Sequence, residues 1–340
     1  MTIDLKKWIR STNFPFCCFV FLLFFVPLAV RDPYFIHTII FICFFAYLGA
    51  SWNILGGYAG QTSLGHSAFV GIGAYVSTLL FINTGLTPWL GMIAGGLAAA
   101  LISFIIGFPA FRLTGPYFAL TTIAFGEILR LWVTDTETFL GISLKGARGI
   151  LLPIKGHSPF EFQFIDKIYY YYIILLLMVI ILLVCWKIEN SRMGFYLRAI
   201  KGNQDAARSL GVEVTWYKLL AFAISAFFTG IGGVFYAQMV LFIIPERILG
   251  LDISIELALI TIIGGRGTLF GPILGAFLLR PLSEITAAYF GGTYLGVHLI
   301  LYGILLMISI LFIPKGMTDL FGRIYQKLIG ASRSKAYVAH

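Results

Sequence analysis

The sequence is poor in charge: Asp, Glu, Lys and Arg together make up 11% of its 340 residues, against roughly 25% in an ordinary soluble domain. Hydrophobic residues make up 59%, which is more apolar side chain than a soluble fold of this length can hide from water. These two percentages exclude a soluble globular enzyme, a disordered chain and a fibrous protein. They leave a protein whose surroundings are mostly lipid.

Residues that usually mark catalysis or metal binding are also scarce. None of the five histidines has the spacing of a metal site, and the chain has no G-x-x-x-x-G-K-[ST] nucleotide-binding loop. The four cysteines lie in or at the ends of apolar runs, as is typical of small buried hydrophobic residues: Cys17, Cys18, Cys43 and Cys185. We therefore expect no catalytic residue, metal or cofactor, and any ATP must be bound by another subunit.

Apolar runs of membrane-spanning length predict an all-α, polytopic transmembrane helical bundle of about ten spans, with broken or re-entrant glycine-rich segments. The eighth run is short and is the one that could be re-entrant. The expected spans are residues 14–30, 34–55, 67–82, 88–108, 117–133, 168–186, 218–240, 253–263, 270–289 and 294–313. Residues 1–13 would then be a cytoplasmic segment, 14–313 the transmembrane domain and 314–340 a basic cytoplasmic tail.

Basic residues are distributed unevenly between the polar loops. Residues 187–218 hold six Lys or Arg against three Asp or Glu, whereas residues 135–167 hold four of each. Because Lys and Arg collect in cytoplasmic loops, we expect 187–217 to be cytoplasmic and 135–167 to be periplasmic. The same loops account for the net charge of +9, which therefore does not indicate a nucleic-acid partner.

Glycine and polar residues cluster in the run Asn53–Tyr75, where Gly56 to Gly73 alone contains six glycines. Such a run weakens a helix, and broken helices are found beside transport paths; the alternative is that the glycines only let helices pack closely. A second run, 264–277, is similar enough to suggest an internal repeat, although two glycine-rich turns could also match by coincidence. The candidates for a translocation path come from these two runs, with the charged residue Glu127 added. They are Gly57, Gly60, Gln61, Ser63, Gly65, His66, Glu127, Gly264 and Gly265.

Ionisable residues inside spans are costly and usually face the bundle interior or a water-filled cavity. Glu127 and Arg130 are three residues apart, and Arg280 and Glu284 are four apart, so each pair shares a helix face. Glu256 and His298 are expected to stand alone. The simpler interpretation of both pairs is a structural strut or a charge near lipid headgroups.

The basic loop predicts a short helix outside the membrane. Asn203 can cap it, Asp205 suits its positive end and Gly211 can close it. A small apolar face is expected from Ile200, Ala206, Ala207 and Leu210. Such a helix suits a groove in another protein or the surface of an anionic membrane.

Three stretches of the chain resemble the permease subunits of bacterial high-affinity branched-chain amino acid ABC importers: residues 53–75, 115–130 and 194–211. The runs 218–227 and 264–275 and the ending 314–316 are similar too, so the resemblance covers most of residues 45–318. It implies that residues 14–313 form a permease domain, one of two homologous but distinct permease subunits in the cell inner membrane. Two cytoplasmic ABC ATPase subunits would dock below, and a periplasmic substrate-binding protein would deliver the amino acid; membrane lipid would surround the complex.

The resemblance also implies a role for the basic loop. Asp205-Ala206-Ala207 followed by Gly211 is similar to the coupling-loop motif of ABC permeases, in which Glu-Ala-Ala is usual, and Asp keeps the charge. The residues expected to couple to the ATPase are Arg198, Asn203, Asp205, Ala206, Ala207, Leu210 and Gly211.

Other functions stay open at this point. Relatives of the family carry urea, other amides or other amino acids, and they share the glycine-rich run. A secondary transporter driven by an ion gradient is a further alternative, with Glu127, Glu256 and Glu284 as candidate membrane carboxylates. An integral-membrane enzyme would need a compact polar cluster, which the sequence does not show.

Overall fold

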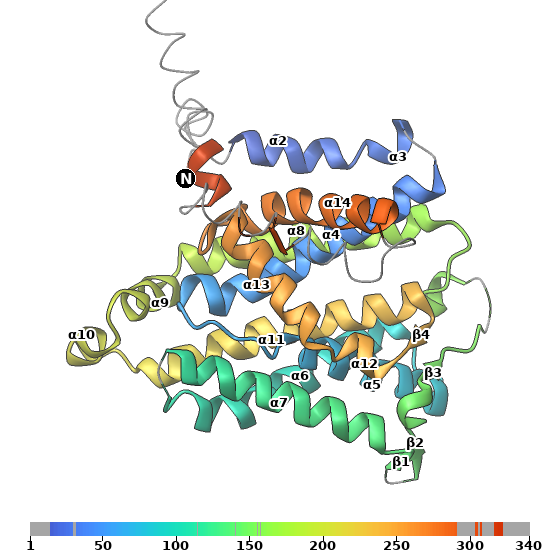
Figure 1. Cartoon of the computed structure of the whole chain (residues 1–340), viewed down its shortest axis with the longest axis horizontal. Helices are drawn as coiled ribbons and strands as arrows, with labels where there is room; N and C mark the ends of the chain where they lie inside the picture. Colours follow the sequence, from blue (N-terminus) through green and yellow to red (C-terminus); the bar gives the residue numbers. More distant parts are fainter. Residues whose placement is uncertain are drawn as a thin grey trace, which may run out of the picture.

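The computed structural model describes residues 14–29, 32–113, 115–139, 141–154, 156, 158–290, 303, 304, 307 and 316–321. Most of this part is helical, and its long helices lie side by side along one axis (Figure 1). The structure confirms the predicted all-α polytopic bundle. The expected segment 1–13, nearly all of the expected tenth span, including His298, and all of the expected tail 314–340 except residues 316–321 lie outside the described residues.

The helices run in the following order. They are α2 (Phe14–Leu23), α3 (Val26–Ala29), α4 (Pro33–Asn53), the π-helix η1 (Ile54–Tyr58), α5 (His66–Thr84), α6 (Pro88–Ala110), α7 (Pro116–Asp135), the 3-10 turns η2 (Gly146–Arg148) and η3 (Pro159–Glu161), α8 (Lys167–Glu189), α9 (Arg192–Gly202), α10 (Gln204–Ser209), α11 (Val214–Val240), α12 (Pro245–Ile248), α13 (Leu251–Gly265) and α14 (Gly271–Phe290). Proline begins α4, α6 and α7, where its missing N–H costs nothing.

Four two-residue strands lie at one end of the bundle. β1 (Thr138–Phe139) pairs antiparallel with β2 (Ile142–Ser143), with Thr138 opposite Ser143. β3 (Ile150–Leu151) pairs antiparallel with β4 (Phe242–Ile243), with Ile150 opposite Ile243. We call this end the strand end.

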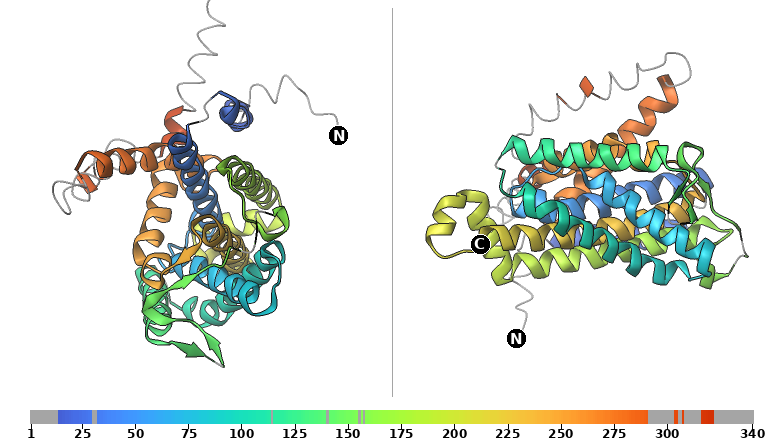
Figure 2. Two further views of the ribbon diagram at one scale, coloured as in Figure 1. Left: turned by 90° about the vertical axis from the view of Figure 1, so that its right-hand side faces the viewer. Right: turned by 90° about the horizontal axis from the view of Figure 1, so that it is seen from below.

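Helices α9 and α10 protrude from the opposite end of the bundle, which we call the knob end (Figures 1 and 2). The start of α2 and residues 316–321 lie on this same side (Figure 1). The loops expected on opposite sides of the membrane, 135–167 and 187–217, are thus at opposite ends of the bundle.

Among the described residues, six helices are long and apolar enough to cross a membrane. They are Pro33–Tyr58, His66–Thr84, Pro88–Ala110, Lys167–Glu189, Val214–Val240 and Pro245–Gly265. Helices α7 and α14 have comparable lengths, and each carries a charged pair. The total of about ten spans stays a prediction.

Two of the expected spans differ from the structure in their details. The run expected as one span over 14–30 folds as α2 and α3 with a turn at Phe24 and Phe25, and α2 lies at the edge of the bundle (Figure 2). The short run expected over 253–263 extends as α13 from Leu251 to Gly265 and is preceded by α12. Its predicted break at the following glycines is present, because α14 begins only at Gly271.

Helices α5, α6 and α11 cross one another tightly. A Cβ atom placed on Gly73 of α5 would lie 2.0 Å from the carbonyl oxygen of Gly230 on α11, and one on Gly233 would lie 1.9 Å from that of Val70. Small residues let helix backbones approach this closely in a membrane, where van der Waals packing replaces the hydrophobic effect. Part of the abundant glycine therefore serves helix packing.

Candidate functional site

The glycine-rich run after α4 forms a buried, non-helical segment. Helix α4 loosens into the π-helix η1, residues 59–65 are not helical, and α5 begins at His66. Gly60 has a φ of +73°, a conformation that favours glycine. The structure thus contains the predicted break, on the same segment that holds Gly57, Gln61, Ser63 and Gly65.

Side chains satisfy the backbone of this segment, as buried irregular backbone requires. The indole Nε1 of Trp52 donates to the carbonyl of Ser63 at 2.7 Å, and the N–H of Leu64 donates to Thr122 Oγ1 on α7 at 3.0 Å. The segment is therefore fixed to both α4 and α7.

His66 joins three helices through a buried chain of hydrogen bonds. Its Nε2 lies 2.8 Å from Ser225 Oγ on α11, and its Nδ1 lies 3.0 Å from Ser63 Oγ. Ser225 Oγ donates its own hydrogen to the carbonyl of Ser51 at 2.7 Å, so the Nε2–H of His66 donates to Ser225, and Nδ1 accepts from Ser63. Both ring nitrogens have partners, and His66 braces the segment.

The second glycine-rich run contacts the first one directly. Asn53 Oδ1 accepts the N–H of Gly267 at 2.9 Å, and Asn53 Nδ2 donates to the carbonyl of Thr268 at 2.9 Å. Arg266 Nε donates to the carbonyl of Gly56 at 2.6 Å. We call residues 53–65 and 264–271 together the inner turns; they hold all of the path candidates except His66, which begins α5 beside them, and Glu127.

Sequence reasoning missed the residues that hold the inner turns together. Asn53 and Arg266 were not singled out, although each is a polar side chain beside a pair of glycines. Nothing local in the sequence indicates that they meet. The similarity of the two glycine-rich runs was the available signal. The contact between the runs agrees with that similarity, but it does not test whether the runs are an internal repeat.

Helices α9 and α10 form a compact knob, defined as residues 192–211. Asn203 Oδ1 accepts the N–H groups of Asp205 at 2.9 Å and Ala206 at 3.0 Å, so it caps α10 as expected. Gly211 closes the helix with a φ of +83°, and Asp205 pairs with Arg208 at 3.4 Å.

The expected apolar face of the knob is only partly correct. Ile200 and Ala207 are buried and pack with Val214, so they hold the knob together from within. Leu210 is 83% exposed, and Ala206 is exposed as well. Of the predicted apolar face, Leu210 and Ala206 are thus the residues that remain accessible on the surface.

The knob is attached to the membrane helices at two points. Arg198 Nη2 donates to the carbonyl of Glu189 at the end of α8 at 3.0 Å. Lys218 Nζ on α11 donates to Gln204 Oε1 of α10 at 2.6 Å. The knob is thus hydrogen-bonded to both α8 and α11.

Lys201 links the knob to the inner turns. A Cβ atom placed on Gly60 would lie 3.0 Å from Lys201 Cγ, and one on Gly267 would lie 2.9 Å from Lys201 Nζ. Partial burial and the neighbouring Arg266 both lower the pKa of Lys201. The end of α9 therefore touches both glycine turns at once.

Charged pairs occupy α7, α13 and α14. Arg130 Nε donates to Glu127 Oε1 at 3.1 Å and Oε2 at 3.0 Å, which confirms the expected pair. The expectation that Glu256 stands alone is wrong, because Arg280 Nη1 lies 3.0 Å from its Oε1. Glu284, the expected partner of Arg280, is more distant at 3.9 Å.

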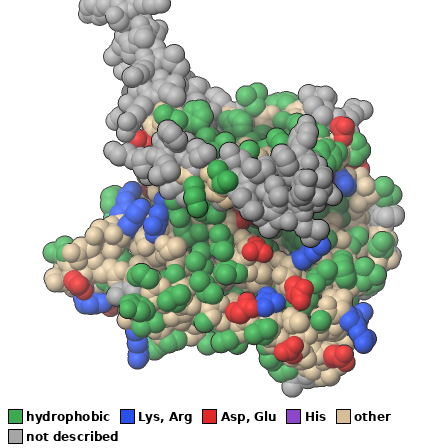
Figure 3. All heavy atoms as spheres, in the orientation of Figure 1, with side chains coloured by type: hydrophobic (Ala, Val, Ile, Leu, Met, Phe, Trp, Pro, Cys, Tyr) green, Lys and Arg blue, Asp and Glu red, His purple; other side chains and the backbone are tan. Residues whose placement is uncertain are grey.

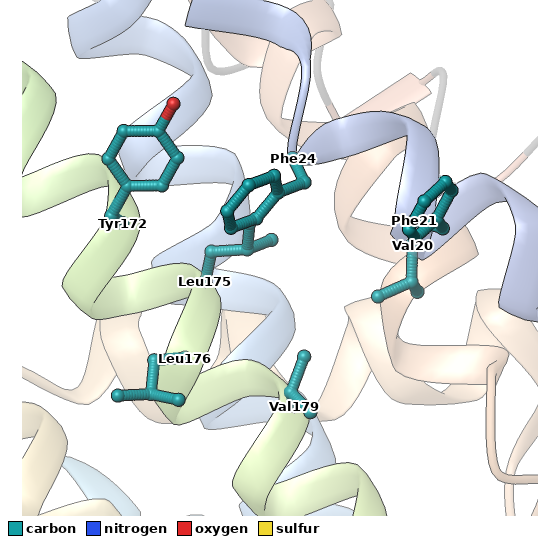
Figure 4. Close-up of a pocket in the computed structure, with 7 residues that line it drawn as sticks. All are labelled: Val20, Phe21, Phe24, Tyr172, Leu175, Leu176 and Val179. Carbon is teal, nitrogen blue, oxygen red and sulfur yellow. The ribbon is translucent and has the colours of Figure 1, made fainter.

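A pocket of about 690 Å³ lies between α2 and α8 and is almost purely apolar (Figure 4). It is lined by Val20, Phe21, Phe24, Tyr172, Leu175, Leu176 and Val179. None of the expected path or coupling residues lines it, and its lining suits hydrocarbon rather than a polar solute. The candidate functional site is therefore the knob, the inner turns and the charged pair on α7.

The structure is thus a bundle of span-length helices with two broken segments in contact and a protruding knob. The chain belongs to the family described as the permease component of branched-chain amino acid transport systems, whose profile matches residues 34–310. It is a multi-pass protein of the bacterial inner membrane.

Individual relatives agree with this family. The high-affinity branched-chain amino acid transport system permease protein LivM of Salmonella typhimurium is 30% identical over 274 residues, which cover 72% of this chain and 63% of the relative. LivM of Escherichia coli K12 is 30% identical over 270 residues, with the same shares covered. The autoinducer 2 import system permease protein LsrC of Yersinia pseudotuberculosis YPIII is 25% identical over 217 residues, 60% of this chain and 57% of the relative. The chain thus spans less than two thirds of the length of these relatives.

Proposed function

We propose that this chain is a permease subunit of an ABC importer that carries branched-chain amino acids across the inner membrane. It would pair with a second, homologous permease subunit, receive substrate from a periplasmic binding protein, and respond to two cytoplasmic ATPase subunits. The family and the LivM relatives support the class of substrate. One observation carries the mechanism: Lys201 at the end of the knob touches both glycine turns.

The knob provides a route for energy from outside the chain. The exposed Leu210 and Ala206 would lie in a groove of an ATPase subunit, while the buried Ile200 and Ala207 keep the knob rigid. ATP binding can shift the conformation only if the ATPases hold the knob differently in their two states. Movement of α9 would then displace Lys201 against Gly60 and Gly267 and alter the inner turns.

The contacts of the membrane carboxylates favour this mechanism over an ion-coupled transporter. Such a transporter needs a carboxylate that binds and releases an ion, whereas Glu256 and Glu284 lie 3.0 and 3.9 Å from Arg280. A substrate such as urea or another amide stays an alternative within the same mechanism, and the transport assay below includes it.

The test is uptake of leucine, isoleucine, valine and urea by vesicles that hold the chain with its partner subunits and binding protein. We expect leucine, isoleucine and valine to accumulate when ATP is supplied inside, and not when an ion gradient is the only energy source. Gradient-driven uptake without the ATPases would overturn the mechanism, and uptake of urea alone would overturn the substrate class.

A matched pair of variants tests the role of the knob. Leu210→Asp changes a residue that is 83% exposed, so the fold should persist, but the charge should abolish docking and reduce ATPase co-purification by about tenfold. The control is Leu151→Asp at the strand end, also exposed, which should leave co-purification unchanged. Equal co-purification of the two variants would remove the knob from the mechanism.

A further inference from the structure

Helix α7 has two different sides. Its buried side consists of Phe118, Thr122, Gly126 and Val133, which face the bundle. A second stripe, with the spacing of one helix flank, consists of Ile123, Glu127, Arg130 and Thr134. This charged flank is only partly covered: the side chain of Glu127 is 44% exposed and that of Arg130 is 24% exposed.

Helix α7 corresponds to the span expected over residues 117–133, and its 20 residues cover about 30 Å at 1.5 Å per residue, about the thickness of a hydrocarbon core. Glu127 and Arg130 lie about 12 and 8 Å from its end at Asp135, so a membrane-spanning α7 places both charges at membrane depth. Half-exposed charges at this depth are strongly disfavoured against lipid and normally face a water-filled cavity or another protein. The flank is therefore unlike the rest of the exposed surface of α7, which carries Leu120, Ile128 and Leu131.

The charged flank lies on the side of α7 that faces α12 and α13. Arg130 interacts electrostatically with Glu246 of α12, and Asp252 near the start of α13 is exposed. Figure 3 shows acidic and basic side chains gathered over α7, α12 and α13 in the midst of hydrophobic ones. The buried side of α7, next to this flank, contacts the inner turns, because Thr122 accepts the N–H of Leu64.

An amino acid at neutral pH carries one ammonium and one carboxylate group, the same two charges that the flank presents. The ammonium group of a zwitterion can replace Arg130 as the partner of Glu127, and its carboxylate group can replace Glu127 as the partner of Arg130. Both side chains then stay paired before and during the passage of the amino acid. A substrate with a single charge would leave either Glu127 or Arg130 without a charged partner inside the protein, which is costly. An uncharged amide would gain nothing from either group.

We propose that the charged flank of α7 lines the translocation path, where Glu127 receives the ammonium group and Arg130 the carboxylate group of the transported amino acid. This inference rests on the proposed transport of branched-chain amino acids and adds a transient binding site within the path. Because the external binding protein captures the substrate first, the site should govern the rate of passage rather than the half-saturating leucine concentration.

The first experiment measures ATP-driven leucine uptake by the complete reconstituted complex, with wild type beside Glu127→Leu/Arg130→Leu. We expect the maximal uptake rate to fall at least about tenfold, the effect of losing one charge-assisted hydrogen bond, while KM changes little. Uptake equal to wild type would show that the pair only neutralises itself against lipid. Loss of the second permease subunit from the complex would show that the pair is a strut between subunits. Either result would overturn the inference, whereas absence of leucine uptake by wild type would instead overturn the proposed function.

A second experiment does not depend on the charged residues. Ile123→Cys on the charged flank and Ile128→Cys on the lipid side of α7 are compared in the complete complex, with Cys17 and Cys18 replaced by serine. A membrane-impermeant, positively charged thiol reagent should label position 123 at least about tenfold faster than position 128, since only a hydrated path forms the reactive thiolate. Equal labelling, or faster labelling at position 128, would overturn the inference.

Discussion

His66 is the most constrained polar side chain of the site. It is completely buried, both ring nitrogens are bonded to serines, and its ring lies against Phe69 and Phe222 at centroid distances of 5.7 and 6.0 Å. A residue with so many fixed contacts defines the geometry of its neighbours rather than binding a passing solute.

His66→Ala should therefore act through stability. The substitution removes two buried hydrogen bonds and an aromatic ring, at a cost of about 2–4 kcal/mol. Thermal unfolding in detergent should show a clear decrease in the midpoint. His37→Ala, at a partly exposed histidine of α4, should change it much less. Equal decreases for the two variants would contradict the bracing role.

At the residue scale, the sequence indicated which polar residues lie inside the bundle better than it indicated which of them contact each other. The Glu127–Arg130 pair was predictable because its partners share one helix face. The Glu256–Arg280 pair was not, because it joins two helices, and a single sequence carries no information on their rotation. The burial of Ala207 was missed because a helix of six residues, such as α10, is too short for a hydrophobic period to be read.

Among the elements, α10 depends most on its ends. A helix this short is not stable in isolation, so the Asn203 cap and the attachment by Lys218 hold it in place. In the proposed mechanism, the knob transmits force only while α10 stays folded.

Asn203→Ala should uncouple transport from ATP hydrolysis. Loss of the cap costs about 1 kcal/mol, enough to unfold α10 part of the time, whereas Asn203→Ser keeps a capping oxygen. The measurement is the amount of ATP consumed per leucine transported, which should increase for the alanine variant and stay near wild type for the serine variant. The same stoichiometry for both variants would contradict this account.

The elements themselves were largely predictable. Long apolar runs predicted α4, α6 and α8, and glycine runs predicted the breaks after α4 and α13. The run expected as one span over 14–30 was misjudged, since apolar composition alone does not reveal the turn at Phe24 and Phe25. The contact between the two glycine turns could not be predicted, because it depends on how distant helices pack.

At the scale of the whole molecule, the crossing of α5, α6 and α11 determines the packing of the bundle. Backbone atoms are in contact there, so no side-chain movement can relieve an added atom.

Gly73→Ala should destabilise the whole bundle. The new methyl group would lie 2.0 Å from the carbonyl oxygen of Gly230 and would push α5 and α11 apart, at a cost of about 3 kcal/mol. The control is Gly126→Ala on α7, where the nearest atom would be 3.7 Å away, an ordinary contact. The yield of monodisperse protein should decrease for the first variant only; a similar loss for both would contradict the importance of the crossing.

The hydrogen bond between Asn53 and Gly267 has a consequence for the biogenesis of the protein. The two residues are 214 positions apart, so α4 enters the bilayer long before the ribosome has made its partner. Until Arg266 and Thr268 are inserted, the amide of Asn53 and the carbonyl of Gly56 are without the bonds that these residues supply, in surroundings where an unpaired polar group is costly. Closure of this end of the bundle is thus a late event of synthesis, and a prematurely terminated chain differs from a finished one at that point.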